Sequence, residues 1–263
     1  MSRATYRNIV LTGASGGIGT ALAERLAAPG RRLLLIGRRA DELAVLAERC
    51  RARGGEVEVG VVDVREGEAL SALILDFDDR FPVDLVLANA GVTCGLTPGH
   101  QPEAPGEARR LLDINYGGML NTVEPLLPRF IARRAGQVAL TSSIAALRPQ
   151  PDLPSYSATK MAVRGYGVAL RGWLREFDVG VSVIFPGFVT SPMSLRHRGA
   201  KPFEISAERA AGIIVRGLER RAAIIAFPLP LAILATLGML IPPVIADWFE
   251  NGFRAYVVPD DGR

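Results

Sequence analysis

The sequence predicts an α/β protein with one doubly wound, mostly parallel sheet of seven strands, helices on both faces, and an apolar C-terminal helical extension. Three observations predict this fold. Strand-like apolar runs alternate with segments of helical length, a glycine-rich turn follows the first run, and the composition is that of an ordered globular protein. The 263 residues are 49% apolar and 22% charged. No linker, repeat or low-complexity tract divides the sequence, so we expect one large α/β domain.

Seven apolar runs have the length and composition of buried parallel strands. They are Asn8 to Leu11, Leu33 to Ile36, Val57 to Val62, Leu85 to Ala88, Val138 to Thr141, Val181 to Phe185 and Ala223 to Phe227. Segments with helical period lie between them, among them Ile18 to Ala28, Ala40 to Arg53, Ala104 to Arg134, Ser155 to Phe177 and Ser206 to Arg220. Pro125 and Pro128 are expected to interrupt the third segment. This alternation predicts a Rossmann-like sheet, which binds ligands beyond the carboxyl ends of its strands.

A glycine-rich turn joins the first strand to the first helix. It reads Thr12-Gly13-Ala14-Ser15-Gly16-Gly17-Ile18-Gly19. Glycine lets the backbone turn tightly and approach a ligand, and a helix N-terminus offers unpaired N–H groups with a partial positive charge. We therefore expect a pyrophosphate at this turn, in contact with Gly13, Ser15, Gly17, Ile18 and Gly19.

The Gly-x-x-x-Gly-x-Gly spacing of this turn resembles the short-chain dehydrogenase/reductase family, in its short single-domain branch. The resemblance extends over nearly the whole chain and implies hydride transfer between a nicotinamide and a carbonyl or alcohol substrate. It also implies contacts to the adenine at Asp63 and Val64, to the ribose at Asn89, Ala90 and Gly91, and to the carboxamide at Pro186, Gly187, Val189 and Thr190.

The end of the second predicted strand bears on the choice of coenzyme. Rossmann folds that bind NAD place an acidic residue there for the ribose hydroxyls, and those that bind NADP use arginine for the 2′-phosphate. Here Gly37 stands at the acidic position, and Arg38 and Arg39 follow it as candidate phosphate ligands. We expect NADP(H) to be preferred. NAD(H) stays an alternative, because arginine is abundant throughout the chain and Gly16 stands where many NADP-dependent relatives carry a basic residue.

A tyrosine and a lysine four residues apart, Tyr156 and Lys160, fall on the same face of a predicted helix. A free phenol has a pKa of about 10, so proton exchange near neutrality needs a nearby positive charge that stabilises the tyrosinate. The chain has 29 arginines and only two lysines, and one of the two stands at this position. An arginine, which is always charged, could not relay a proton.

The family resemblance assigns a role to each member of a four-residue set. Tyr156 is the general acid or base, Ser143 hydrogen-bonds the substrate oxygen, and Lys160 lowers the pKa of the tyrosine and binds the ribose. Asn115 holds a water in the proton relay, although a hydrogen bond to its own helix backbone is the alternative for this residue.

Two other functions stay open at this point. A catalytically silent NADP(H)-binding sensor or scaffold is disfavoured by the intact four-residue set, since such a protein needs no proton chemistry. A sugar-nucleotide epimerase or dehydratase is disfavoured because those relatives are longer and carry a different glycine turn.

The family places a substrate lid at about residues 191–208, where this sequence mixes apolar and basic side chains. Such a segment suits a substrate with an acidic group, but a solvated loop is the commoner structure for it. His100 and His197 have no metal-ligand spacing, so we expect surface residues and no metal. Cys50 and Cys94 also lack metal or redox spacing, which is typical of reduced thiols in a cytoplasmic protein.

The C-terminal extension, residues 228–263, follows the catalytic domain of residues 1–227. No charged residue occurs from Ala222 to Ala246. Prolines limit an uninterrupted apolar helix to Leu231 to Ile241, about 16 Å long, which is too short for a bilayer core of about 30 Å. We expect the extension to pack on its own domain, on a partner subunit of a homodimer or homotetramer, or on a membrane surface with Trp248, Phe249 and Tyr256 near the headgroups. The net charge of +4 gives only a weak attraction to anionic partners such as nucleotide phosphates or a membrane surface and decides nothing by itself. We expect no nucleic-acid partner.

Overall fold

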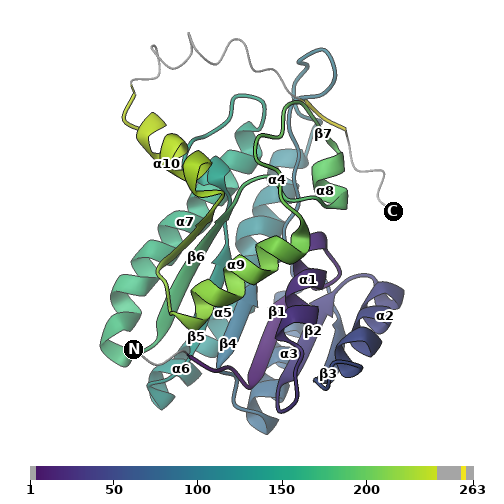
Figure 1. The fold of residues 1–263 in the computed structure, drawn as a ribbon, viewed down its shortest axis with the longest axis vertical. Helices are drawn as coiled ribbons and strands as arrows, with labels where there is room; N and C mark the ends of the chain where they lie inside the picture. The colour runs from purple at the N-terminus through teal and green to yellow at the C-terminus, as the bar shows by residue number, and fades with distance from the viewer. Residues whose placement is uncertain (1–3, 242–255, 259–263) are drawn as a thin grey trace.

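In a computed structural model, which describes residues 4–241 and 256–258, the chain forms a seven-stranded parallel sheet with helices on both faces (Figure 1). The strand order is β3-β2-β1-β4-β5-β6-β8. The strands are β1 (Asn8–Thr12), β2 (Arg32–Gly37), β3 (Glu56–Val61), β4 (Leu85–Ala88), β5 (Gln137–Thr141), β6 (Gly180–Pro186) and β8 (Ile224–Phe227). All seven predicted runs are therefore strands, and the predicted doubly wound sheet is confirmed.

Helices cover both faces of the sheet. They are α1 (Gly17–Leu26), α2 (Ala40–Arg51), α3 (Gly67–Arg80), α4 (Glu107–Leu112), α5 (Gly118–Val123), α6 (Leu127–Arg133), α7 (Pro154–Leu174), α8 (Pro192–Leu195), α9 (Ala207–Glu219) and α10 (Leu229–Gly238). Helices α1, α2 and α9 pack in the core on one face, and α3, α5, α6 and α7 pack in the core on the other. Strands buried on both faces read as continuous apolar runs, which explains why the sequence predicted them well.

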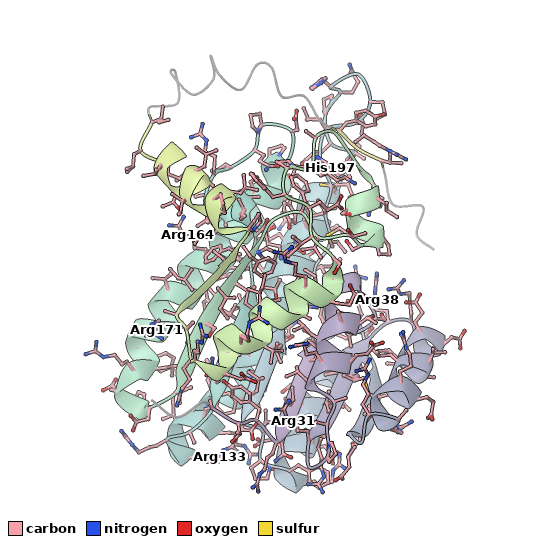
Figure 2. The ribbon with its side chains drawn as sticks, viewed as in Figure 1. Arg31, Arg38, Arg133, Arg164, Arg171 and His197 are labelled. Atoms are coloured by element: carbon pink, nitrogen blue, oxygen red, sulfur yellow. The ribbon has the colours of Figure 1, made fainter. Side chains whose placement is uncertain are left out.

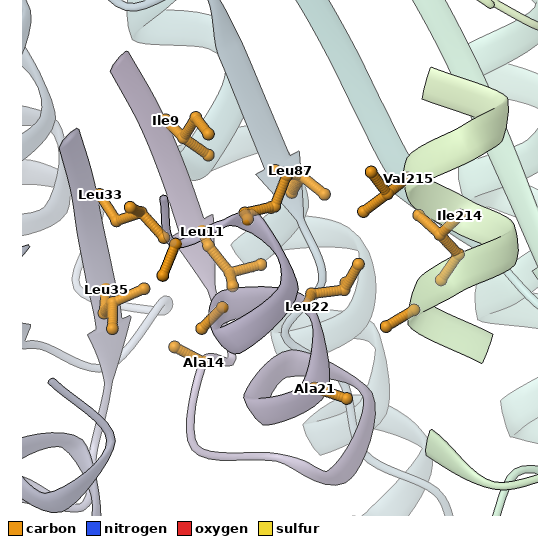
Figure 3. Packing of buried hydrophobic residues seen from close by; sticks show 14 of the residues in the cluster. Ile9, Leu11, Ala14, Ala21, Leu22, Leu33, Leu35, Leu87, Ile214 and Val215 are labelled. Atoms are coloured by element: carbon orange, nitrogen blue, oxygen red, sulfur yellow. The ribbon is translucent and has the colours of Figure 1, made fainter. Parts of the chain in front are cut away.

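The first core joins the glycine turn to the rest of the sheet. Leu11 of β1 and Leu87 of β4 pack with Leu22 of α1, and Ile214 of α9 closes the cluster (Figure 3). All four side chains are fully buried. Burial of each contributes about 1.5–3 kcal/mol. This core therefore holds the N-terminus of α1 rigidly beside the ends of β1 and β4.

The long helix expected from Ala104 to Arg134 is four consecutive pieces and a 3₁₀ turn rather than one rod. It begins only at Glu107, passes through a π-helical turn at Asp113–Gly117 and continues as α5. A 3₁₀ turn at Glu124–Leu126 contains Pro125 and precedes α6. The prolines interrupt the α-helical pattern as expected, because proline lacks the backbone donor. The π turn was not predicted, and it carries Asn115.

The predicted apolar helix of the extension is present as α10, which begins two residues earlier than predicted. A second small sheet, which the sequence did not predict, pairs β7 (His197–Arg198) antiparallel with β9 (Tyr256–Val257). Trp248 and Phe249 lie outside the described residues. Within residues 4–241 and 256–258, no helix combines the length and apolar character needed to cross a bilayer.

Candidate active site

The glycine turn is shaped so that its backbone faces the carboxyl ends of the strands. Gly13 has a φ of +65°, and a Cβ there would lie 2.7 Å from Cα of Ala90. A Cβ on Gly19 would lie 2.0 Å from the carbonyl oxygen of Gly13. Helix α1 has no side-chain cap and no acidic residue in its first turn. Its N–H groups and partial positive charge therefore fit an anionic pyrophosphate.

A cavity of about 430 Å³ extends from this turn across the ends of the strands. The predicted cofactor residues that line it are Gly13, Ser15, Gly17, Ile18, Gly19, Arg38, Arg39, Asp63, Val64, Asn89, Ala90, Gly91, Tyr156, Lys160, Pro186, Gly187 and Val189. Thr190 does not line the cavity. Its side chain is exposed, and its hydroxyl donates to the carbonyl oxygen of Ile205 at 3.4 Å.

Two arginines follow β2 at the rim of the cavity (Figure 2 labels Arg38). Nη1 of Arg38 lies 3.7 Å from a carboxylate oxygen of Asp63, and Arg39 donates to the carbonyl oxygen of Ser15 at 2.7 Å. Hydrogen bonds from Arg65 hold the pKa of Asp63 below its usual value, and Arg38 acts in the same direction. Arg38 is largely exposed, so its ion pair is weak and a bound phosphate could replace Asp63 at small cost.

Asn89 connects three strands at the floor of the cavity. Its Nδ2 donates to the carbonyl oxygens of Thr12 and Gly13, both at 3.3 Å, and its Oδ1 accepts from the hydroxyl of Thr141 at 3.4 Å. These bonds hold the turn after β4 against the glycine turn. Asn89 therefore shapes this part of the cavity through the backbone of its neighbours.

Tyr156 and Lys160 project from the first turns of α7, which begins at Pro154. The ammonium Nζ of Lys160 donates to the carbonyl oxygen of Thr141 at 2.9 Å and lies 5.8 Å from the ring centroid of Tyr156. The Ser142 hydroxyl donates to the carbonyl oxygen of Lys160 at 2.8 Å. Burial lowers the pKa of Lys160 from 10.5 to about 8. The end of β5 thus fixes this lysine beside the tyrosine.

Ser143 lies directly after β5 and contacts both the local backbone and the tyrosine. Its Oγ accepts from the backbone N–H of Ala145 at 3.1 Å, which caps a short 3₁₀ turn at Ile144–Ala146. Burial raises the pKa of Tyr156, and a hydrogen bond with the Ser143 side chain opposes that rise. Within the chain alone, burial dominates, so the phenol stays protonated at neutral pH.

Asn115 does not bond to its own helix, which was the alternative that the sequence left open. Its Nδ2 donates to the carbonyl oxygen of Val92 and to the hydroxyl of Thr159, both at 3.0 Å, and its Oδ1 accepts from the N–H of Val92 at 2.8 Å. The π turn directs the Asn115 side chain toward Val92 and Thr159. Such π turns are often found at functional sites. A Cβ on Gly91 would lie 3.2 Å from both Oδ1 of Asn115 and Nζ of Lys160.

The substrate end of the cavity contains residues that the sequence did not single out. They are Ile144, Gln150, Leu153, Phe188 and Leu231, and they lie beside Met193, Arg196 and His197 of the predicted lid, which also line the cavity. They come from distant segments without a shared motif, so only the folded chain brings them together. Within residues 4–241 and 256–258, no group of three or more potential metal ligands occurs.

His197 corrects the expectation that both histidines lie at the surface. His100 is exposed, but His197 is only 9% exposed and its ring lies 5.1 Å from that of Phe188 (Figure 2 labels His197). Burial and the charge of Lys201 lower the pKa of His197. The reason is that β7 pairs with β9, which covers this side of the lid. The imidazole is therefore neutral at pH 7 and forms part of the cavity wall.

Comparison with known proteins agrees with this arrangement. The family model for short chain dehydrogenases matches residues 7–201. An uncharacterized oxidoreductase of Myxococcus xanthus is 32% identical over 248 residues, which cover 94% of this chain and 97% of the relative.

Solved structures with the same fold contain either nicotinamide nucleotide. A short chain dehydrogenase of Mycobacterium paratuberculosis bound to NAD has a TM-score of 0.73 and 26% identity, over 84% of this chain and 94% of that one. A metagenomic short-chain oxidoreductase in complex with NADP has a TM-score of 0.69 and 27% identity, with the same coverage of 84% and 94%. This chain belongs to the short-chain dehydrogenase family and is an NAD(P)-dependent oxidoreductase that acts on CH–OH or C=O groups.

Proposed function

We propose that the protein transfers a hydride between NADP(H) and a carbonyl or alcohol substrate, with Tyr156 as the proton donor or acceptor. The observation that carries this proposal is the grouping of Tyr156, Ser143 and Lys160 at the carboxyl end of β5, at the wall of the nucleotide cavity. The nicotinamide, when bound, supplies or accepts the hydride. The substrate oxygen would lie between the Tyr156 and Ser143 hydroxyls, because both can donate hydrogen bonds as negative charge develops on it.

The proton chemistry depends on Lys160. Its ammonium is held by the carbonyl oxygen of Thr141, which leaves other N–H groups free to bind ribose hydroxyls. With the phenol pKa raised by burial, the tyrosinate forms only when positive charge approaches it, from the ammonium and from the oxidised nicotinamide.

Asn115 extends the proton path toward solvent in this proposal. Its two amide donors are used by Val92 and Thr159, and its Oδ1 has one remaining lone pair. Since Oδ1 and the Lys160 ammonium border the same position above Gly91, a water there can bridge the two. The amide would then hold both the water and the loop that follows β4.

NADP(H) is the preferred coenzyme in this proposal. Gly37 leaves no carboxylate to repel a 2′-phosphate, and Arg38 lies at the cavity rim with an exposed guanidinium. Pro186, Gly187, Val189 and the backbone of Thr190 are assigned to the nicotinamide carboxamide, as the resemblance implies. The Thr190 hydroxyl would have to leave Ile205 to join them.

We further propose that the exposed apolar side of α10 is covered in the working protein, by a second copy or by a lipid surface. Leu234 is 67% exposed and Leu237 is 56% exposed, while the opposite side of the helix, with Ala232 and Ala235, is buried. An apolar patch of this kind marks an interaction site more often than a free surface.

The function is tested by measuring NADPH and NADH binding and then turnover of a panel of aldehydes, ketones and alcohols at the nicotinamide absorbance. Tight NADPH binding with turnover of at least one compound supports the proposal. Binding without turnover of any compound would favour a silent nucleotide-binding protein.

A further inference from the structure

The far wall of the substrate cavity is mainly apolar and comes from four separate parts of the chain. Ile144 follows β5, Leu153 precedes α7, Phe188 and Met193 lie after β6, and Leu231 belongs to α10. The last of these lies beyond the family-model match, which ends at residue 201. The C-terminal extension therefore contributes directly to the cavity wall.

Helix α10 is fixed beside the cavity at both of its ends. Its start is tied to the Pro186-Gly187 turn, because the N–H of Gly187 donates to Phe227 at 2.7 Å and a Cβ on Gly187 would lie 2.8 Å from Pro228. Near its end, Arg148 donates to the carbonyl oxygen of Gly238 at 3.1 Å. Leu231 thus sits on a rigid element rather than on a loose tail.

Strand β9 pairs with β7 of the lid. In Figure 1 the short yellow segment lies alongside β7. The N–H of Val258 donates to the carbonyl oxygen of Arg196 at 2.9 Å, and Nε of Arg196 donates to the carbonyl oxygen of Val258 at 2.9 Å. The N–H of Val257 donates to Leu96 at 3.0 Å. The strand therefore joins the lid to the loop after β4.

Val257 and Leu153 both approach the position that a side chain on Gly95 would occupy. A Cβ on Gly95 would lie 2.6 Å from the Leu153 side chain and 3.0 Å from that of Val257. Val257 is only 3% exposed. Leu153 lines the cavity. Because residue 95 has no side chain, strand β9 can pack directly behind this part of the cavity wall.

Among the basic side chains of the lid, Arg196 lines the cavity but is engaged with the protein. Arg196 is bonded to Val258 and lies near Glu107, whose pKa is lowered by hydrogen bonds from Arg110 and also by the charge of Arg196. The His197 ring is buried and packs at a tilt against the ring of Phe188. The apolar part of this wall therefore offers a substrate an uncharged surface, and Arg196, which also lines the cavity, is already engaged by Val258.

We propose that α10 and β9 of the C-terminal extension determine specificity: Leu231 completes, and Val257 supports from behind, a pocket for a carbonyl or alcohol carried on an apolar chain or ring. This inference rests on the proposed oxidoreductase function and adds the substrate class to it. Leu231 contacts the substrate body directly. Val257 is a positioning residue, since it acts through Leu153 and the lid.

The test is a chain-length series of methyl ketones from three to ten carbons, with 4-oxopentanoate as an anionic comparison. In the wild-type protein we expect kcat/KM to rise with length, by about fourfold for each methylene group that becomes buried. Leu231→Ala should lower kcat/KM for the long ketones by about tenfold or more and leave the three-carbon ketone nearly unchanged. Ile224→Ala is the matched control, because Ile224 lies on β8, is 61% exposed and does not line the cavity.

Val257→Asp tests the strand, and Tyr256→Asp is its matched control with the same added charge on the opposite face of the strand. We expect Val257→Asp alone to raise KM for long ketones, with the Kd for NADPH unchanged as proof of folding. A flat chain-length profile, or a preference for 4-oxopentanoate, would overturn the inference while turnover upheld the proposed function. Absence of turnover with every compound would overturn both.

Discussion

At the scale of single residues, the pKa values of Tyr156 and Lys160 depend on the balance between burial and nearby charge. The sequence indicated that Lys160 would lower the pKa of Tyr156, whereas in the folded chain burial raises the pKa of Tyr156 and lowers that of Lys160. Both effects favour the uncharged forms of the two groups. In the proposed mechanism, the phenol and the ammonium become charged only when substrate and nucleotide supply compensating interactions.

Tyr156→Phe should abolish turnover, by about a thousandfold or more in kcat, because it removes the exchangeable proton while the ring still fills its position. The Kd for NADPH should change little, since the phenol hydroxyl contributes little to nucleotide affinity. Steady-state kinetics on a confirmed substrate and fluorescence titration of the nucleotide provide the two measurements. Activity close to wild type would remove Tyr156 from the mechanism.

Lys160→Arg should also lose most activity although it keeps the positive charge. The guanidinium is larger and planar, and it would have to replace a compact ammonium that is 4% exposed and bonded to Thr141. Ser157→Ala is the comparison variant. Ser157 is buried on the same face of α7 as Lys160 but lies outside the proposed proton path. Equal kcat for Lys160→Arg and wild type would contradict the proposed role of the ammonium.

The lowered pKa of Lys160 has a consequence for stability against pH. Below about pH 8 the lysine is protonated in both folded and unfolded chains, so the cost of burying its charge is fully present. Between about pH 8 and 10.5 the unfolded chain holds more protons, and the free energy of unfolding should rise by up to about 1.4 kcal/mol per pH unit.

Urea unfolding of the wild type and of Lys160→Met between pH 7 and 10 measures this effect. Across that pH range, the free energy of unfolding of the wild type should rise relative to that of Lys160→Met. Titration of the tyrosines cancels from the comparison, because both proteins contain them. A constant difference would mean that the lysine keeps its ordinary pKa in the fold.

At the scale of elements, the proposed coenzyme preference rests on the turn between β2 and α2. Arg38→Ala should weaken NADPH binding by about 1–3 kcal/mol and hardly affect NADH, as expected for loss of a charge-assisted contact to phosphate. Gly37→Asp should shift the preference toward NADH. A Cβ at residue 37 would lie 3.3 Å from Oγ of Ser15, so the serine must move by a few tenths of an ångström.

Isothermal titration of both nucleotides against the wild type and the two variants checks this prediction. Arg49→Ala is a suitable control, since Arg49 lies on α2 but pairs with Glu24 at 2.9 Å and does not line the nucleotide cavity. Equal affinity of the wild type for NADPH and NADH would refute the phosphate assignment.

At the scale of the whole molecule, the C-terminal extension gives the fold an apolar surface beside the substrate cavity. Leu234→Ser with Leu237→Ser should leave thermal stability almost unchanged, because both side chains are mostly exposed. The pair should nevertheless remove the interaction proposed for α10.

Vesicle flotation and sedimentation velocity of the wild type and the double variant distinguish a lipid surface from a second copy as the partner of α10. Loss of flotation alone identifies a lipid surface, and loss of the oligomer alone identifies a second copy. If the double variant matched the wild type in both assays, α10 would have neither role.

Local patterns in the sequence determined the seven strands, the glycine turn, the Tyr156 and Lys160 pair and the apolar helix of the extension. These features depend on interactions within a few residues or on the continuous burial of parallel strands, so a linear pattern contains them. The π turn that aims Asn115 at Val92, the Arg38 and Asp63 pair and the burial of His197 depend on residues far apart in the chain. Tertiary packing alone decided them, because only the folded sheet brings the ends of separate strands and the C-terminal strand to one cavity.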